Sequence, residues 1–508
     1  MPASKALTDL FLAFLVLCCL PLSTPILLLN YVYVLIFPLY PVHKRLRRTP
    51  GFKSRKILIT GVDTRYGLRL ARAFHQTGHV VVGAYYEPGP LLNHVRFSNA
   101  VSRFYRLASE TRGRREASYV ANLLNIVERE HADLWIDCFQ SADPSVEART
   151  REAVQEKTNC KCFALRAGNV PYLASRDAFL KYLENQGYTV PESYQVTSRA
   201  EIHNVLGKAR GTRRYLLESL EPNGVRANMA RTKLPSRTVS QTYDAISRIS
   251  ITNTTPWKLE RDVNGLENIS TSAIVVRGSV KLFVASRTIR PGCYQVLEPT
   301  SALSRSMLRF VQTFARKEGS EFTTHLGVDF CVDEQPTESG VVQTILPVQV
   351  SIHAQPALQS MVGMNGSIAL SRAYLSIFAP AESKAEKKMT RPVSQIIQQQ
   401  PQTDDVALPQ NKIIGVYCIG QDLTHFLFEP LAELVAFRNG LTYFLRQLTE
   451  LLGHLVFWKD DTYDFRDPLP FWWSYQICLP LRLLMTNSLM TNPSNIQHAT
   501  ITNGEKHT

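Results

Sequence analysis

Between residues 56 and 166, short apolar runs alternate with amphipathic stretches of helical period. The run KILIT at 56–60 is followed by LRLARAFHQTG, in which Leu68, Ala71 and Phe74 share one helical face, and then by HVVVGAYY. The same order recurs with helices at 115–130 and 143–156 and strands at 134–138 and 162–166. Because strands that alternate with helices form parallel sheets, this part of the chain predicts a doubly wound α/β domain.

The pattern changes after residue 174. Residues 174–198 predict a helix that ends at Gly187, followed by an extended segment. Beyond residue 200, stretches of period two mix with helical stretches, which is typical of an α+β domain. The predicted strands lie at 213–219, at 272–289 as a hairpin that turns near Gly278, at 325–334 and at 340–352.

The N-terminal segment has a different character. Residues 10–42 contain no charged side chain, and a bilayer span needs about 20 apolar residues. Pro21, Pro25 and Pro38 interrupt the run, so either one tilted helix with an interfacial piece or a Pro-turned hairpin fits. A cleaved signal peptide is the alternative, but its apolar region would be shorter.

A basic cluster without acidic residues follows this run and consists of Lys44, Arg45, Arg47, Arg48, Lys53, Arg55 and Lys56. Such a cluster beside a membrane span stays on the cytoplasmic side. We therefore expect an N-terminal membrane anchor, at the endoplasmic reticulum, with the rest of the chain in the cytosol. The nine scattered cysteines agree with a reducing compartment.

Composition narrows the class of partner. Among 508 residues 44% are hydrophobic, which excludes wholesale disorder. The net charge of +14 suggests a polyanionic partner, but seven of these charges lie in residues 44–56, which leaves +7 for the rest of the chain. The basicity therefore favours a lipid surface and argues against nucleic acid.

We expect six regions along the chain. They are a membrane anchor with its basic segment (1–50), the α/β domain (51–170), the α+β domain (171–378), a flexible linker (379–412), a C-terminal helical aromatic region (413–486) and a polar tail (487–508). The linker is rich in Ala, Glu, Lys, Gln and Pro. The aromatic residues concentrated between 457 and 475 favour either contact with a membrane interface or packing in the core.

The turn after the first predicted strand reads GVDTRYG. Its glycines, Gly61 and Gly67, lack the additional glycine that a dinucleotide-binding turn needs, and Arg65 occupies the middle. A nicotinamide enzyme is therefore the less favoured alternative, and a tight structural turn is the better interpretation.

Three segments, in this order of elements, resemble the ATP-grasp superfamily. They are SRDAFLKYLENQGYTVPESYQVTS at 175–198, PWKLERDVNGLENISTSAIVVRGSVKLFVA at 256–285 and FWKDDTYDFRDPLPFWW at 457–473. The last resembles the C-terminal part of a fungal, membrane-anchored subfamily found with secondary-metabolite genes. The resemblance implies a preliminary α/β domain and a two-subdomain clamp that binds ATP and Mg²⁺. It also implies a ligase that joins a carboxylate, through an acyl phosphate, to an amine, alcohol or thiol.

The resemblance also implies site residues. Those of the nucleotide pocket are Glu218, Glu260, Arg261 and Glu267, and those of the metal site are Asp329, Gln349 and Ser351. Gln349 and Ser351 stand where the family has Glu and Asn, and Glu218 stands where a lysine contacts the phosphates. Because Mg²⁺ prefers anionic oxygen ligands, these substitutions predict weakened cofactor binding. The hypotheses are a ligase with a degenerate metal site, its catalytic residues unknown, or a catalytically degraded fold that acts as a membrane scaffold or accessory protein.

Overall fold

The computed structural model describes residues 13–14, 16–36, 52–86, 92–107, 115–139, 143–209, 213–219, 231–249, 251, 257–263, 266–290, 292–337, 340–379, 406–409, 414–482 and 484–485. The chain forms two compact units. The first comprises Met1–Pro171, Thr271–Gly327 and Ser351–Thr508, and the second comprises Tyr172–Ser270 and Val328–Val350.

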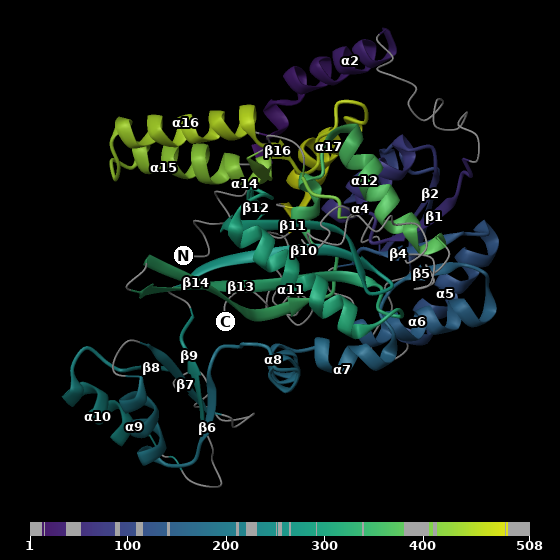
Figure 1. The fold of residues 1–508 in the computed structure, drawn as a ribbon. Helices are drawn as coiled ribbons and strands as arrows, with labels where there is room; N and C mark the ends of the chain where they lie inside the picture. Colours follow the sequence, from purple (N-terminus) through teal and green to yellow (C-terminus); the bar gives the residue numbers. More distant parts are fainter. Residues whose placement is uncertain are drawn as a thin grey trace, which may run out of the picture. The chain divides into compact units, whose positions relative to one another are not determined.

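The first unit contains a five-stranded parallel sheet in the order β3-β2-β1-β4-β5 (Figure 1). Its strands are β1 (Lys56–Thr60), β2 (Val80–Tyr86), β3 (Arg103–Leu107), β4 (Leu134–Asp137) and β5 (Lys161–Phe163). The connecting helices are α4 (Arg65–Gln76), α5 (Arg115–Glu130) and α6 (Pro144–Lys157). The predicted doubly wound α/β domain is confirmed, and β3 is a strand that the sequence pattern did not predict.

Side chains of these strands alternate between two cores. Ile57 packs in the same core as Phe74 of α4, whereas Leu58 packs in the same core as Leu123 of α5 and Val154 of α6. Successive residues of a strand point to opposite faces, so helices must cover both faces of this sheet.

A seven-stranded sheet has the order β14-β13-β10-β11-β12-β15-β16. Its strands are β10 (Glu267–Val276), β11 (Ser279–Arg290), β12 (Cys293–Val296), β13 (Thr324–Thr337), β14 (Gly340–Ser351), β15 (Gly415–Tyr417) and β16 (Lys459–Asp460). The predicted hairpin near Gly278 is confirmed, and this glycine has a φ of +71°. The C-terminal region, predicted to be helical, therefore also supplies two strands, which are too short to give a readable period.

Further helices complete the first unit. They are η2 (His94–Phe97), η3 (Ala167–Asn169), α11 (Ala302–Glu318), η5 (Pro356–Ser360), α12 (Gly363–Leu375), η6 (Ser376–Phe378), α14 (Ile419–Leu423), η8 (Thr424–Phe428), α15 (Glu429–Val435), α16 (Leu441–Phe457), α17 (Leu469–Trp473) and η9 (Ser474–Cys478). A short helix, α7 (Val170–Leu173), lies at the boundary between the units. The Tyr66 hydroxyl of α4 lies 2.8 Å from the Tyr374 hydroxyl of α12, so the two helices share a core.

The second unit contains a four-stranded sheet in the order β6-β9-β7-β8. Its strands are β6 (Ser193–Val196), β7 (Tyr215–Ser219), β8 (Thr232–Leu234) and β9 (Trp257–Arg261), and its helices are α8 (Arg176–Asn185), α9 (Arg199–Lys208) and α10 (Val239–Ser247). Ile202 of α9 and Ile246 of α10 are buried against Leu217 and Leu259 of the sheet. The predicted mixture of strands and helices beyond residue 200 is thus confirmed.

The N-terminal apolar segment contains α2 (Leu20–Ile36). None of the helices in the described ranges is both long and apolar enough to cross a membrane, which does not support the predicted transmembrane segment. Residues 1–12 and 37–50 of the predicted anchor lie outside the described residues, as do most of the predicted linker and the polar tail. Within that linker, Ala407 pairs with β11, since its N–H donates to Lys281 O at 2.9 Å.

Candidate active site

A cavity of about 1350 Å³ lies in the first unit. Its walls come from the turn after β1, the end of β11 and the C-terminal segments around α14, α16 and the π-helical turns η8 and η9. π-Helical turns are rare and often occur at functional sites. Two of them on the wall of one large cavity mark it as the candidate site.

Arg290, the last residue of β11, lines this cavity. Its Nη2 donates to Asp422 Oδ1 at 2.9 Å, and its guanidinium carbon lies 4.0 Å from the centre of the Phe426 ring. Its Nε and Nη1 are buried and have no hydrogen-bond partner within the described part of the chain. Because unsatisfied buried donors are costly, an anionic ligand that reached these two N–H groups would be favoured.

Arg65 lies on the cavity wall at the first turn of α4. Its Nε lies 2.9 Å from Asp461 Oδ2, and its Nη2 donates to Cys418 Sγ at 3.4 Å. Burial opposes the charge of Arg65, but Asp461 holds the Arg65 pKa above its usual value. Burial also raises the pKa of Asp461, to about 7, although Arg65 works against that rise.

A glycine allows the turn after β11 to approach Arg65 closely. Gly292 has a φ of +75°, and a Cβ at this position would lie 3.0 Å from Arg65 Nη1 and 2.2 Å from Gln421 Oε1. The turn between β11 and β12 can therefore approach Arg65 and α14 only without a side chain. Arg65 and Arg290 both line the cavity.

Asp422 links Arg290 to a histidine. Only 1% of Asp422 is exposed, and its Oδ2 lies 2.5 Å from Nδ1 of His454 on α16. The His454 ring stacks on Trp458 with a centroid distance of 4.3 Å. Because Nδ1 is engaged by Asp422, Nε2 is the ring nitrogen left for a ligand, and an Asp–His pair of this kind can accept a proton.

Two further histidines line the cavity. His94 Nδ1 lies 3.3 Å from Asp63 Oδ1, yet burial outweighs this carboxylate and lowers the pKa of His94 to about 3. His94 is therefore neutral at physiological pH. His425 is exposed and lies 3.3 Å from Glu429 in the next helical turn.

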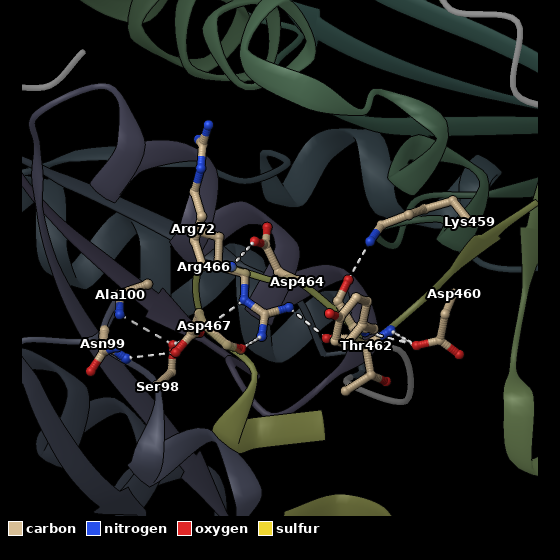
Figure 2. Close-up of polar contacts among 11 residues, drawn as sticks. Arg72, Ser98, Asn99, Ala100, Lys459, Asp460, Thr462, Asp464, Arg466 and Asp467 are labelled. Carbon is tan, nitrogen blue, oxygen red and sulfur yellow. Dashed lines mark hydrogen bonds and ion pairs between the residues drawn. The ribbon is translucent and has the colours of Figure 1, made fainter. Parts of the chain in front are cut away.

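The segment that carries Asp461 is fixed to α4 by a buried ion pair (Figure 2). Arg72 donates from Nε to Asp467 Oδ2 at 2.9 Å and from Nη1 to Thr462 O at 2.6 Å. Asp467 also accepts from Ser98 Oγ at 2.6 Å and from the Asn99 N–H at 3.0 Å. Residues 459–468 are thereby held in place behind the cavity wall.

The predicted nucleotide-pocket residues lie in the second unit, and three of them, Glu218, Glu260 and Arg261, make ion pairs. Glu260 is buried and receives both terminal nitrogens of Arg176, one of them at 2.9 Å, while Lys258 Nζ lies 3.3 Å away. Arg261 Nη2 lies 2.7 Å from Asp333 Oδ1. These side chains have structural partners whether or not they also contact a nucleotide.

The other two predicted pocket residues are more accessible. Glu218 on β7 pairs with Arg231, which offsets the negative charge that the sequence placed there. Glu267 is exposed at the beginning of β10.

The predicted metal ligands lie on strands β13 and β14. Asp329 on β13 is partly buried, which raises its pKa although Ser270 donates a hydrogen bond to it. Gln349 on β14 is exposed, and Ser351 Oγ accepts a hydrogen bond from Gln355 Nε2 at 2.5 Å. Across the described ranges, no three His, Cys, Asp or Glu side chains come together as metal ligands. Asp329 and Gln349 belong to the second unit and Ser351 to the first.

Sequence reasoning missed the residues of the cavity. Arg65 was assigned to a structural turn, and Asp422 and His454 had no role because they stand 32 residues apart. The predicted cluster of aromatic residues gave a partial signal. Most of its members are half-buried, and Trp473 packs on Phe97 with a centroid distance of 4.0 Å, which favours core packing for this part.

No family model and no curated protein matches the sequence. Among solved structures, the chain is similar to the biotin carboxylase subunit of pyruvate carboxylase, with 14% identity, a TM-score of 0.47 and coverage of 66% of this chain and 72% of that chain. It is similar to L-amino acid ligase from Bacillus licheniformis, with 14% identity, a TM-score of 0.40 and coverage of 67% and 78%. The corresponding values for N5-carboxyaminoimidazole synthetase from Staphylococcus aureus are 13%, 0.40, 63% and 78%.

These TM-scores lie below 0.5, so the roles assigned below rest on the chain's own residues. In fold, the chain is similar to enzymes of the ATP-grasp superfamily, the family that its sequence resembles.

Proposed function

We propose that this protein is an ATP-dependent ligase that binds a carboxylate in the cavity lined by Arg65 and Arg290 and joins it to an amine, alcohol or thiol. The proposal depends on Arg290, which lines the cavity. Its buried Nε and Nη1 have no hydrogen-bond partner among the described residues. Nε and Nη1 lie on different edges of the guanidinium group, so each can donate to a single oxygen of an anionic ligand. Arg65, which pairs with Asp461, is a second guanidinium group on the wall of the same cavity.

His454 is the group that we assign to proton transfer. Asp422 fixes the ring through Nδ1 at 2.5 Å, which favours the tautomer with a free lone pair on Nε2. In the transfer step, a bound nucleophile would lose its proton to Nε2 as it attacks the carboxyl carbon of an acyl phosphate. The C–O bond to the phosphate would then break, and inorganic phosphate would leave with the electron pair. Asp422 would stabilise the resulting imidazolium, because the buried carboxylate lies beside it.

ATP supplies the energy that activates the carboxylate when it is bound. The sequence resemblance assigns its pocket to the second unit, around Glu218, Glu260, Arg261 and Glu267.

We also propose that the protein acts in a fungal secondary-metabolite pathway, at the cytosolic face of the endoplasmic reticulum. Support comes from the resemblance of residues 457–473 to a fungal subfamily and from the basic residues between 44 and 56. The exposed apolar side chains of α2, among them Leu22, Ile26 and Leu29, also favour contact with lipid.

The test measures ADP release by the full-length protein with ATP, Mg²⁺ and panels of carboxylates and amines. We expect turnover with at least one pair, and a decrease in kcat of about 10²- to 10⁴-fold for His454→Gln. His425→Gln is the matched control, because His425 lines the same cavity but is exposed and lies beside Glu429. Equal effects of the two substitutions contradict the assignment of His454.

A second candidate is a scaffold or accessory protein that binds a ligand without ATP turnover. The observation that favours it is Gln349, an exposed neutral amide at a position where the resemblance implies a carboxylate ligand. Titration calorimetry with ATP and Mg²⁺ separates the two, because the scaffold predicts no heat of nucleotide binding, whereas the ligase predicts saturable binding.

A further inference from the structure

Helix α16 has two faces of opposite character. Arg446, Glu450 and His454 follow each other at intervals of four residues and line the cavity. The opposite face carries Leu441, Leu445, Leu452, Leu455 and Val456, all exposed. A helix on a water-facing surface normally turns its polar face outward. The inverted pattern therefore indicates that something apolar covers the outer face.

The neighbouring helix extends the same apolar surface. α15 and α16 lie side by side as a hairpin (Figure 1), and Leu431 and Val435 of α15 are also exposed. At the tip, Phe437 is 96% exposed and has a φ of +54°. This conformation ends α15, because the N–H of Arg438 donates to Glu433 O at 2.9 Å and that of Phe437 to Leu434 O at 3.1 Å.

Lipid is the occupant that fits this surface best. The exposed residues of the hairpin form an apolar face rather than a concave groove. Helix α2 belongs to the same unit, although it comes from a distant part of the sequence, and it also has exposed apolar side chains: Leu28, Leu29 and Val32. Lys44, Arg45, Arg47 and Arg48 follow α2 in the sequence, without acidic residues among them, and complement an anionic headgroup layer. Arg55 and Lys56 do not belong to this complement, because they pair with Asp133 and Glu130.

We propose that the outer face of the α15–α16 hairpin lies in the interface of a lipid bilayer, with Phe437 inserted. The cavity behind α16 then receives an amphiphilic carboxylate from that leaflet. This substrate class rests on the function proposed above. Phe457 and Ile414 are both exposed and on the cavity wall, so an apolar rim leads inward to Arg290 and Arg65. A carboxylate head would bind the arginines while its chain follows the apolar rim.

The first experiment measures binding of the full-length protein to vesicles of phosphatidylcholine and phosphatidylserine by cosedimentation. We expect the double variant Phe437→Glu/Val456→Glu to bind vesicles at least about tenfold more weakly, because two exposed apolar side chains no longer enter the interface. The matched control, Val239→Glu on α10, also replaces an exposed apolar residue by an acid and should bind like the native protein. Equal binding of the double variant and the native protein overturns the proposal.

The second experiment locates the contact. Trypsin cleaves after Arg438 at the hairpin tip, and vesicles should slow this cleavage at least about tenfold while cleavage after the exposed Arg248 of the second unit stays unchanged. Unchanged cleavage after Arg438 overturns the proposal. Protection of Arg438 that rises with protein concentration in the absence of vesicles also overturns it, since a second copy of the chain then covers the hairpin.

The third experiment tests the substrate class without nucleotide, so that it can succeed even if no ATP turnover exists. Dodecanoate should bind the full-length protein at least about tenfold more tightly than acetate, which lacks the chain, or dodecanol, which lacks the charge. Arg290→Gln and Arg65→Gln should each weaken dodecanoate binding and leave dodecanol binding unchanged. Dodecanoate binding that both variants retain overturns the assignment of the cavity, whereas absence of ADP release alone contradicts only the proposed ligase.

Discussion

Removal of Arg72 should release the C-terminal segment from α4. Arg72 and Asp467 are 3% and 4% exposed, and Arg72 donates to the Asp467 side chain, to Asp467 O at 2.7 Å and to Thr462 O at 2.6 Å. In Arg72→Met the methionine fills similar space but leaves Asp467 with Ser98 and Asn99 as its remaining partners. Breaking a buried ion pair from one side costs about 3–5 kcal/mol. Since domains are stable by only about 5–15 kcal/mol, the variant should lose a large part of the stability of this unit.

Urea unfolding monitored by tryptophan fluorescence measures this effect, because Trp472 and Trp473 lie directly after the anchored segment. We expect Arg72→Met to lower the midpoint of the transition strongly. Arg248→Met is the control, since Arg248 and Asp244 form an exposed pair on α10 worth at most about 0.5 kcal/mol. If the two variants unfold at the same urea concentration, the buried pair does not hold the segment and the reasoning is refuted.

Three further outcomes are expected. Gly292→Ala should cost about 1–3 kcal/mol in thermal unfolding, because φ is +75° and the new Cβ would lie 2.2 Å from Gln421 Oε1. Gly187→Ala is the comparison. Gly187 is exposed, has a φ of +78° and has open space around it, so the stability lost in this variant measures the backbone strain alone. Burial lowers the pKa of His325 to about 3, below the unfolded value of about 6.5, so the unfolded state binds more protons between these values. Stability should therefore fall as the pH decreases from about 6.5 towards 3, and His325→Phe should unfold with a weaker dependence on pH over that window. Glu260→Gln should destabilise the second unit by about 1–3 kcal/mol, since Arg176 and Lys258 lose their shared carboxylate. If the variant is as stable as the native protein but binds ATP more weakly, Glu260 contacts the nucleotide directly.

The α/β domain could be predicted because its signal is local. Ile57 and Leu58 belong to opposite faces of β1, and the helices that cover those faces begin within a few residues of the strands. A strand and the helix that covers it lie within about 30 residues of each other, so both can be predicted from the hydrophobic periods of that stretch alone. The second unit was predicted less finely, since its strands are only three to five residues long.

The cavity could not be predicted for the converse reason. Arg65, Arg290, Asp422 and His454 come from four distant parts of the sequence and meet only after the large sheet has formed. Single residues of these types are common on any surface, so no spacing distinguishes them. The resemblance predicts a nucleotide pocket in the second unit. In the described ranges, however, the buried side-chain N and O atoms without a hydrogen bond lie largely in the first unit.

The order of strands in the large sheet has a consequence for synthesis on the ribosome. β12 ends at Val296, and its partner β15 begins at Gly415, about 120 residues later. At about 5–20 residues per second, the edge of β12 stays without its partner for roughly 6–24 seconds. During this time the nascent chain has an open strand edge that can pair with other chains. Faster translation of this interval, or a chaperone that covers β12, should therefore increase the yield of the folded protein.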